Sequence, residues 1–142
     1  TNGGASWTLR GRLFEGPGER FALQIAFDPR DPNLVFVRSH SRTDSANRCP
    51  VPAGGVYRSA NGGQSFAIVL DGRFCDASRE VFVDPVRSNV YLGSDNSSSP
   101  YCTSINLGET FSCITESGFG VSGVIAIHPR TGQLWRSNLA QT

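Results

Sequence analysis

Residues 59–66 read Ser-Ala-Asn-Gly-Gly-Gln-Ser-Phe, and residues 104–111 read Ser-Ile-Asn-Leu-Gly-Glu-Thr-Phe. Both stretches fit one pattern, S-x-N-x-G-x-[ST]-F. The first seven residues, Thr-Asn-Gly-Gly-Ala-Ser-Trp, repeat this pattern without its first Ser and with Trp in place of Phe. Asn and Gly favour a tight turn here, because the Asn side chain can bond nearby backbone and Gly tolerates positive φ. The repetition predicts a turn-and-strand unit that occurs several times in the chain.

A second unit recurs between these motifs. Residues 25–29, 81–85 and 125–129 each read as an apolar strand that ends in Asp-Pro or His-Pro. A second apolar strand follows Asn33, Asn89 and Gln133. Proline cannot donate to a β-ladder, so it ends the first strand of each pair. Short strands that repeat about every 45 residues are typical of β-propeller blades, and no window has the apolar spacing of a helix.

The predicted strands group into blades. In chain order we expect strands at 6–9, 21–28, 34–39, 55–59, 65–70, 80–84, 90–93, 101–104, 110–115, 123–128 and 133–137. Residues 21–71 and 72–117 each form a blade, residues 1–20 end one blade, and residues 118–142 begin another. The prediction is an all-β chain of four-stranded antiparallel sheets, about three blades' worth within a larger ring.

Composition bounds the class of protein. The chain has 142 residues, of which 38% are hydrophobic and 18% charged, with 16 Gly and 8 Pro. These values suit a turn-rich globular domain. The net charge of +1 provides no strong field for nucleic acid or an anionic membrane. All 13 basic residues are Arg, which we interpret as the bias of a GC-rich bacterial genome, with bidentate anion recognition as the alternative.

The repeated motif resembles the Asp box, S-x-D-x-G-x-T-W, of bacterial neuraminidase repeats. This box occurs in sialidases, sortilin-type receptors, xyloglucanase-type glycoside hydrolases and photosystem-assembly propellers. The resemblance covers nearly the whole chain and implies that each motif closes the outer hairpin of a blade. The matching residues are Asn2, Gly4, Trp7, Ser59, Asn61, Gly63, Phe66, Ser104, Asn106, Gly108 and Phe111. Asn replaces the family's Asp in every copy, which favours a structural turn over a calcium ligand or a catalytic carboxylate.

Four Cys without a C-x-x-C motif favour two disulfides and an oxidising compartment. In the hairpin that the resemblance implies, Cys102 and Cys113 lie on its two strands, so we expect them to pair. Cys49 and Cys75 would then form the second bridge, although four Cys allow three pairings. The expected location is extracellular or periplasmic.

Catalytic chemistry has little support in the sequence. A sialidase needs an arginine triad, but the usual Arg-Ile-Pro segment is absent. Arg38, Arg58 and Arg136 lie on or at the ends of predicted strands and could face a central channel, but we favour solvated strand edges for them. The Asp of each repeated Pro turn, replaced by His128 in the last copy, is a turn residue first. No metal-ligand spacing, nucleophile elbow or phosphate-binding glycine loop occurs. We expect no catalytic residue, cofactor or metal.

The polar loop 40–52 is the best candidate for a ligand site, because long loops are often functional. It contains Arg42, Asp44, Asn47 and Arg48. The first hypothesis is a secreted, non-enzymatic propeller module for protein or glycan binding or for assembly. The alternative is a fragment of an extracellular glycoside hydrolase or sialidase whose catalytic residues lie outside this chain, and a third is a polymerising structural subunit.

Open blade edges favour association. The expected partners are therefore other protein chains, either the rest of a propeller or further copies of this chain. A glycan is a further candidate partner. We expect no nucleic acid and no membrane insertion.

Overall fold

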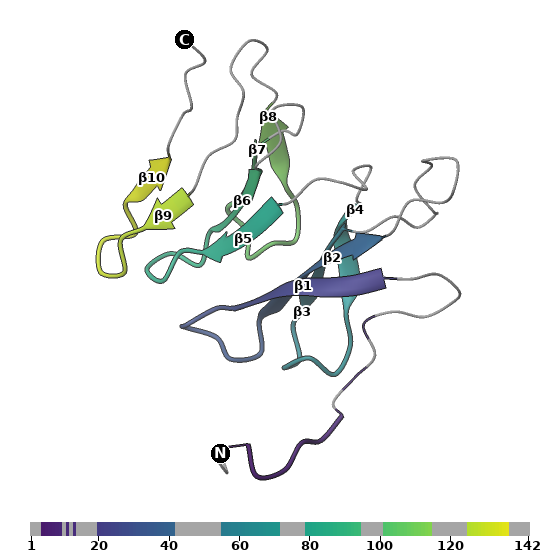
Figure 1. Cartoon of the computed structure of the whole chain (residues 1–142). Coiled ribbons are helices and arrows are strands. Elements are labelled where there is room, and N and C mark those ends of the chain that lie inside the picture. The colour runs from purple at the N-terminus through teal and green to yellow at the C-terminus, as the bar shows by residue number, and fades with distance from the viewer. Residues whose placement is uncertain are drawn as a thin grey trace, which may run out of the picture.

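The computed structural model describes residues 4–9, 11, 13, 20–41, 55–71, 79–94, 101–114 and 125–136. This described part is all β and contains no helix (Figure 1). Its ten strands form three antiparallel sheets. None of the described segments is a long apolar helix of the kind that could cross a membrane.

The first two sheets have the same plan. Sheet 1 has the order β1-β2-β3-β4, with β1 at Arg20–Phe27, β2 at Val35–Ser41, β3 at Gly55–Ser59 and β4 at Ala67–Asp71. Sheet 2 has the order β5-β6-β7-β8, with β5 at Arg79–Val83, β6 at Val90–Ser94, β7 at Tyr101–Ser104 and β8 at Ser112–Ile114. Sheet 3 pairs β9 (Ile125–Ile127) with β10 (Leu134–Arg136). The predicted all-β architecture of four-stranded antiparallel sheets is confirmed.

Two sequence expectations need correction. Residues 6–9, expected to form a strand, lie outside any strand of the structure. The alignment of Asn33 with Asn89 is also wrong by one position. Phe27 pairs with Val35 and Val83 pairs with Val90, so the first Pro turn is one residue longer than the second. The remaining predicted strands have counterparts whose ends differ by a few residues.

The main core lies between sheets 1 and 2. Ala26 and Phe36 are cross-strand partners, so they share the face of sheet 1 that packs on sheet 2. The buried residues of this core are Leu34, Phe36, Val56, Val81, Val90, Leu92 and Cys102. A smaller cluster of Val35, Val37 and Tyr57 lies on the opposite face of sheet 1, where Leu13 and Phe66 pack against it. Alternating β-branched and aromatic residues thus bury both faces of β2.

The first strands of the two sheets, β1 and β5, are joined by a side chain. Gln24 of β1 donates from Nε2 to the carbonyl oxygen of Val81 at 3.1 Å. Its Oε1 accepts from the Val81 N–H at 2.8 Å. The Gln24 amide therefore pairs with the β5 backbone as a neighbouring peptide would, and this fixes sheet 2 beside β1 (Figure 1).

Candidate functional site

The β3–β4 hairpin, residues 59–66, contains a hydrogen-bond network centred on Asn61. The Ser59 hydroxyl accepts from the N–H groups of Asn61 at 3.2 Å and Gly63 at 2.9 Å, and donates to Asn61 Oδ1 at 2.8 Å. The same Oδ1 accepts from the Ser65 N–H at 3.0 Å. Asn61 Nδ2 donates to Ser65 Oγ at 2.8 Å. Every polar group of the Asn61 side chain is therefore used inside its own turn.

The β7–β8 hairpin, residues 104–111, repeats this network with the same donors and acceptors. Ser104 Oγ accepts from the N–H groups of Asn106 at 3.4 Å and Gly108 at 3.0 Å, and donates to Asn106 Oδ1 at 2.8 Å. Asn106 bonds Thr110 through Oδ1 at 3.1 Å and through Nδ2 at 2.9 Å. We call residues 59–66 and 104–111 the Asn hairpins. The Ser and Asn side chains of their motifs bond groups of their own turns.

The second Asn hairpin also packs against the neighbouring sheet. Gly108 has a φ of 76°, and a β-carbon at this position would overlap the ring of Phe36 in β2. Gly63 has a φ of 85°, and the nearest side chain is the ring of Phe66 in its own hairpin. Gly108 thus serves two purposes, because it permits the turn and lets the Phe36 ring approach the backbone.

Three Pro turns join β1 to β2, β5 to β6 and β9 to β10. In the second turn Asp84 Oδ1 accepts from the N–H groups of Val86 at 2.8 Å and Arg87 at 3.2 Å. In the third turn His128 Nδ1 accepts from the N–H groups of Arg130 and Thr131, both at 3.3 Å. An imidazole nitrogen therefore takes the place of a carboxylate oxygen as the acceptor. His128 is a turn residue whose Nδ1 is occupied.

The first Pro turn satisfies its buried carboxylate less completely. Asp28 Oδ1 accepts from the Arg30 N–H at 2.8 Å, but its buried Oδ2 has no hydrogen-bond partner. In the second turn Asp84, which is fully buried, has Arg87 Nη1 at 3.3 Å from its Oδ2. Asp31 stands in the first turn at the position that Arg87 has in the second, so this position supplies no guanidinium for Asp28 Oδ2.

Arginines connect each Pro turn to the next. Arg30 Nη1 donates to the carbonyl oxygen of Val86 at 2.6 Å. Arg87 Nη1 donates to the carbonyl oxygens of Thr131 and Gly132, each at 3.4 Å. The three turns therefore form a row at one end of the strands of the three sheets. Arginine suits this position because its planar guanidinium has several donors.

The three arginines considered for a central channel have different positions. Arg58 donates from Nε to the Leu107 carbonyl oxygen at 2.7 Å, and its Nη2 lies 3.7 Å from Glu109 Oε1. Both acceptors belong to the second Asn hairpin, so Arg58 joins sheet 1 to sheet 2. Arg38 is half-buried on β2, and Arg136 is the last residue of β10. The guanidinium of Arg58 is therefore used between the two sheets.

A disulfide joins Cys102 of β7 to Cys113 of β8. The two residues are cross-strand partners, and Cys102 is fully buried in the core between the sheets. Cys49 and Cys75, the other expected pair, lie outside the described residues. The bond ties the short edge strand β8 to the sheet.

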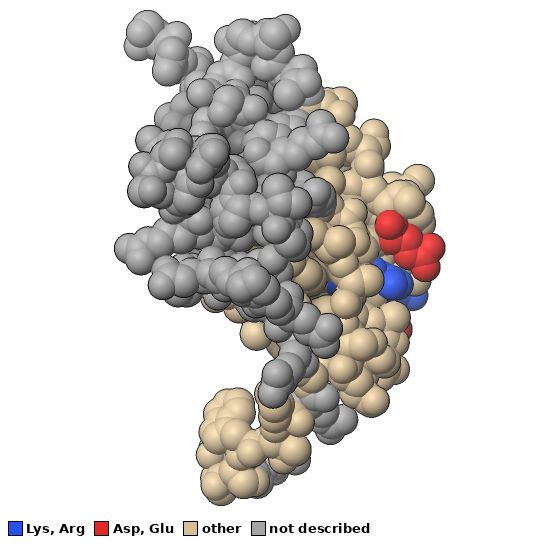
Figure 2. Space-filling view, turned by 90° about the vertical axis from the view of Figure 1, so that its right-hand side faces the viewer, with Lys and Arg blue, Asp and Glu red and all other residues tan. Residues whose placement is uncertain are grey.

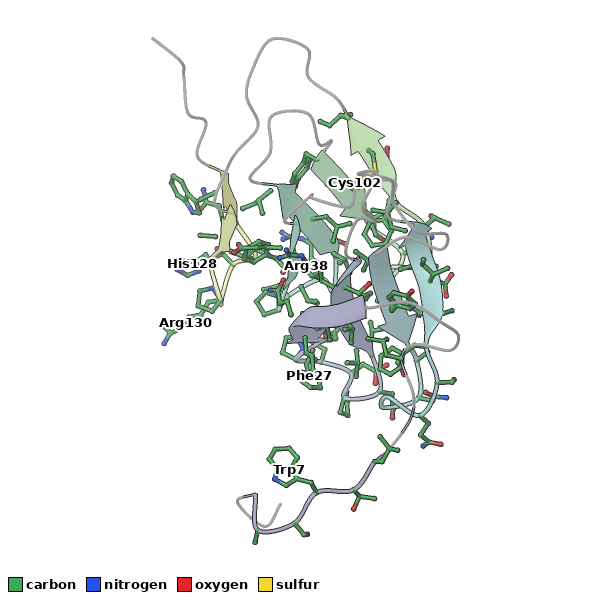
Figure 3. All side chains as sticks on the ribbon, turned by 45° about the vertical axis from the view of Figure 1, so that its right-hand side comes forward. Trp7, Phe27, Arg38, Cys102, His128 and Arg130 are labelled. Atoms are coloured by element: carbon green, nitrogen blue, oxygen red, sulfur yellow. A yellow bond between two sulfur atoms is a disulfide. The ribbon has the colours of Figure 1, made fainter. Side chains whose placement is uncertain are left out.

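The candidate ligand residues Arg42, Asp44, Asn47 and Arg48 also lie outside the described residues, as does Asn2. Ser41 and Gly55 bound the loop that contains these candidate residues. They lie at the end of the sheet 1 strands opposite the Pro turn and the Asn hairpin. Trp7 is 91% exposed, and its ring lies beside Gly4 rather than in a core (Figure 3).

Within the described ranges, no three His, Cys, Asp or Glu side chains gather as metal ligands would. The described part of the face shown in Figure 2 has one small group of charged side chains and is otherwise neutral. Comparison with known proteins found no matching family model and no curated protein with significant similarity.

Proposed function

We propose that this chain contributes blades to an Asp-box-type propeller and acts as a non-enzymatic secreted module for binding or assembly. The observation that carries this proposal is the use of the motif side chains. Asn61, Asn106, Asp84 and His128 all bond backbone groups of their own turns. Asp and His, which act as catalytic or ligand-binding residues in many proteins, have structural roles in these turns, as Asn does.

The ligand site of the proposed module is the loop between β2 and β3. The end of the sheets that carries the Pro turns is occupied by hydrogen bonds within and between sheets. This loop begins at the opposite end of the strands, after Ser41. Arg42 and Arg48 supply guanidinium groups, which bind carboxylates through bidentate hydrogen bonds. Asp44 and Asn47 supply acceptors for hydroxyl groups. This combination suits an acidic glycan or an acidic protein segment. The Cys102–Cys113 disulfide supports an extracellular or periplasmic location.

The test is binding to an array of glycans that includes sialosides and xyloglucan fragments, with product analysis of the same mixtures. We expect binding without turnover by the wild-type chain, and at least a tenfold loss of affinity in Arg42→Ala/Arg48→Ala, of the order expected when charge-assisted hydrogen bonds are removed. Arg136→Ala is the control, because this arginine belongs to β10 and not to the loop. Released sugar would support the glycoside hydrolase alternative. Equal binding by both variants would exclude this loop as the ligand site.

A further inference from the structure

One face of sheet 1 is open at β1. Ile25 and Phe27 lie on the face turned away from sheet 2 and are 58% and 63% exposed. The register places Val81 and Val83 of β5 at the corresponding positions, because Phe27 and Val83 each form the last pair before a Pro turn. Val81 is 2% exposed and packs on sheet 1. The same position is thus covered in sheet 2 and uncovered in sheet 1.

The opposite end of the row has the complementary open face. Trp135 of β10 is 61% exposed and pairs with the exposed Ala126 of β9. Their counterparts in sheet 1 are Phe36 and Ala26, which pack on sheet 2. Phe36 is fully buried there. Sheet 3 therefore presents the face that accepts a following sheet, but no described residue covers it.

The row of Pro turns also has complementary groups at its two ends, a donor in the third turn and an acceptor in the first. Arg30 donates to the carbonyl oxygen of Val86, the residue at its own position in the next turn. Arg130 has this position in the third turn, and its exposed guanidinium has no partner among the described residues. It points outward from the β9–β10 turn (Figure 3). In the first turn, no described residue donates to the carbonyl oxygen of Arg30, which corresponds to Val86.

We propose that these two ends are the halves of one head-to-tail interface between copies of this chain. Ile25 and Phe27 of a second copy pack on Trp135 and Ala126, and Arg130 donates to the carbonyl oxygen of the second copy's first Pro turn. The contact continues the packing of sheet 2 on sheet 1. Leu13 lies against the Val35, Val37 and Tyr57 cluster, so the open part of the face is at β1.

A second copy is the occupant because one chain has both halves. The exposed Asp31 also places a negative charge in the first turn, which suits the positive Arg130. The interface uses different surfaces on its two sides, so repetition closes a ring where the rotation permits and otherwise gives a filament. The interface forms without a glycan, so association of copies can be tested separately from ligand binding by the loop between β2 and β3.

The test is association measured by sedimentation velocity across a wide concentration range. Wild-type protein should form concentration-dependent oligomers, and Phe27→Glu and Trp135→Glu should each be monomeric. A mixture of the two variants should give a dimer, because Phe27→Glu retains the sheet 3 face and Trp135→Glu retains the β1 face. Arg130→Ala should weaken the association of the wild-type pair several-fold.

Ile105→Glu is the control, since Ile105 is 85% exposed in the second Asn hairpin, outside both faces. It should associate like the wild type. All four positions are exposed, and an unchanged circular dichroism spectrum will show that each variant folds. A wild-type chain that stays monomeric, or folded variants whose mixture stays monomeric, would overturn the proposal.

Discussion

The ring of Phe36 lies where a side chain on Gly108 would project, so the second Asn hairpin rests directly on the neighbouring sheet. Phe36 is fully buried by this contact and by the core between sheets 1 and 2. The hairpin therefore closes its own sheet and also contacts the adjacent one. This double role explains why a small residue is needed at Gly108.

Gly108→Ala should destabilise the protein more than Gly62→Ala. Both glycines have positive φ, 76° and 67°, so both substitutions cost about 1–2 kcal/mol of backbone strain. A β-carbon at Gly62 would meet only Asn33 Oδ1 at 3.7 Å, whereas at Gly108 it would overlap Phe36. The overlap adds about 1–3 kcal/mol, which urea unfolding of the two variants will measure. Equal losses would show that the Phe36 ring does not occupy this space.

Asn61→Asp should leave stability nearly unchanged, whereas Asn61→Ala should cost about 0.5–1.5 kcal/mol, the net contribution of a typical hydrogen bond. The Asp retains the acceptor for the Ser65 N–H, and the Ser65 hydroxyl can rotate to donate to its second oxygen. The Ala variant leaves these groups without the side chain that satisfies them. Thermal melts of the two variants are the measurement. An Asp variant as unstable as the Ala variant would contradict the network.

His128→Asp should preserve the third Pro turn, and His128→Leu should open it. The carboxylate supplies an acceptor for the N–H groups of Arg130 and Thr131, as Asp84 does for its own turn. Leucine has similar bulk but no acceptor, so these amides should exchange with solvent faster. Hydrogen exchange followed by NMR at Arg130 and Thr131 is the readout. Unchanged protection in the leucine variant would show that Nδ1 is not the acceptor.

The same substitution should have opposite effects in the first two Pro turns. Asp84→Asn removes the charge that faces Arg87 and should cost about 1–3 kcal/mol. Asp28→Asn should be neutral or stabilising, because it removes a charge from a buried oxygen that has no partner and leaves Oδ1 to accept from Arg30. Urea midpoints of the two variants will compare them. A loss at Asp28 as large as that at Asp84 would show that its carboxylate is satisfied.

The local features of the fold follow from short stretches of sequence. Asn61 and Gly63 specify a hairpin, and Pro29 or Pro85 ends a strand, because each acts through backbone groups a few residues away. The strands themselves alternate apolar residues, and this pattern predicts their positions. The strand expected at residues 6–9 is absent because a strand also needs a partner, which propensity does not supply.

The contacts between sheets could not be read from sequence. Gln24 and Val81 are 57 positions apart, and Arg30 and Val86 are 56 apart, so no local pattern marks them. The candidate site shows the same division. Roles inside a turn, such as that of Asn106, were accessible, whereas the contact of Arg58 with Leu107 depends on how the sheets pack.

Stacking of sheet 2 on sheet 1 through the second Asn hairpin is the central claim, and nuclear Overhauser contacts test it most directly. Strong cross-peaks are predicted between the Phe36 ring and the Gly108 α-protons, and between the Gln24 side-chain amide and the Val81 N–H. If these are missing while the cross-strand peaks within each sheet are present, the sheets form but do not stack as described.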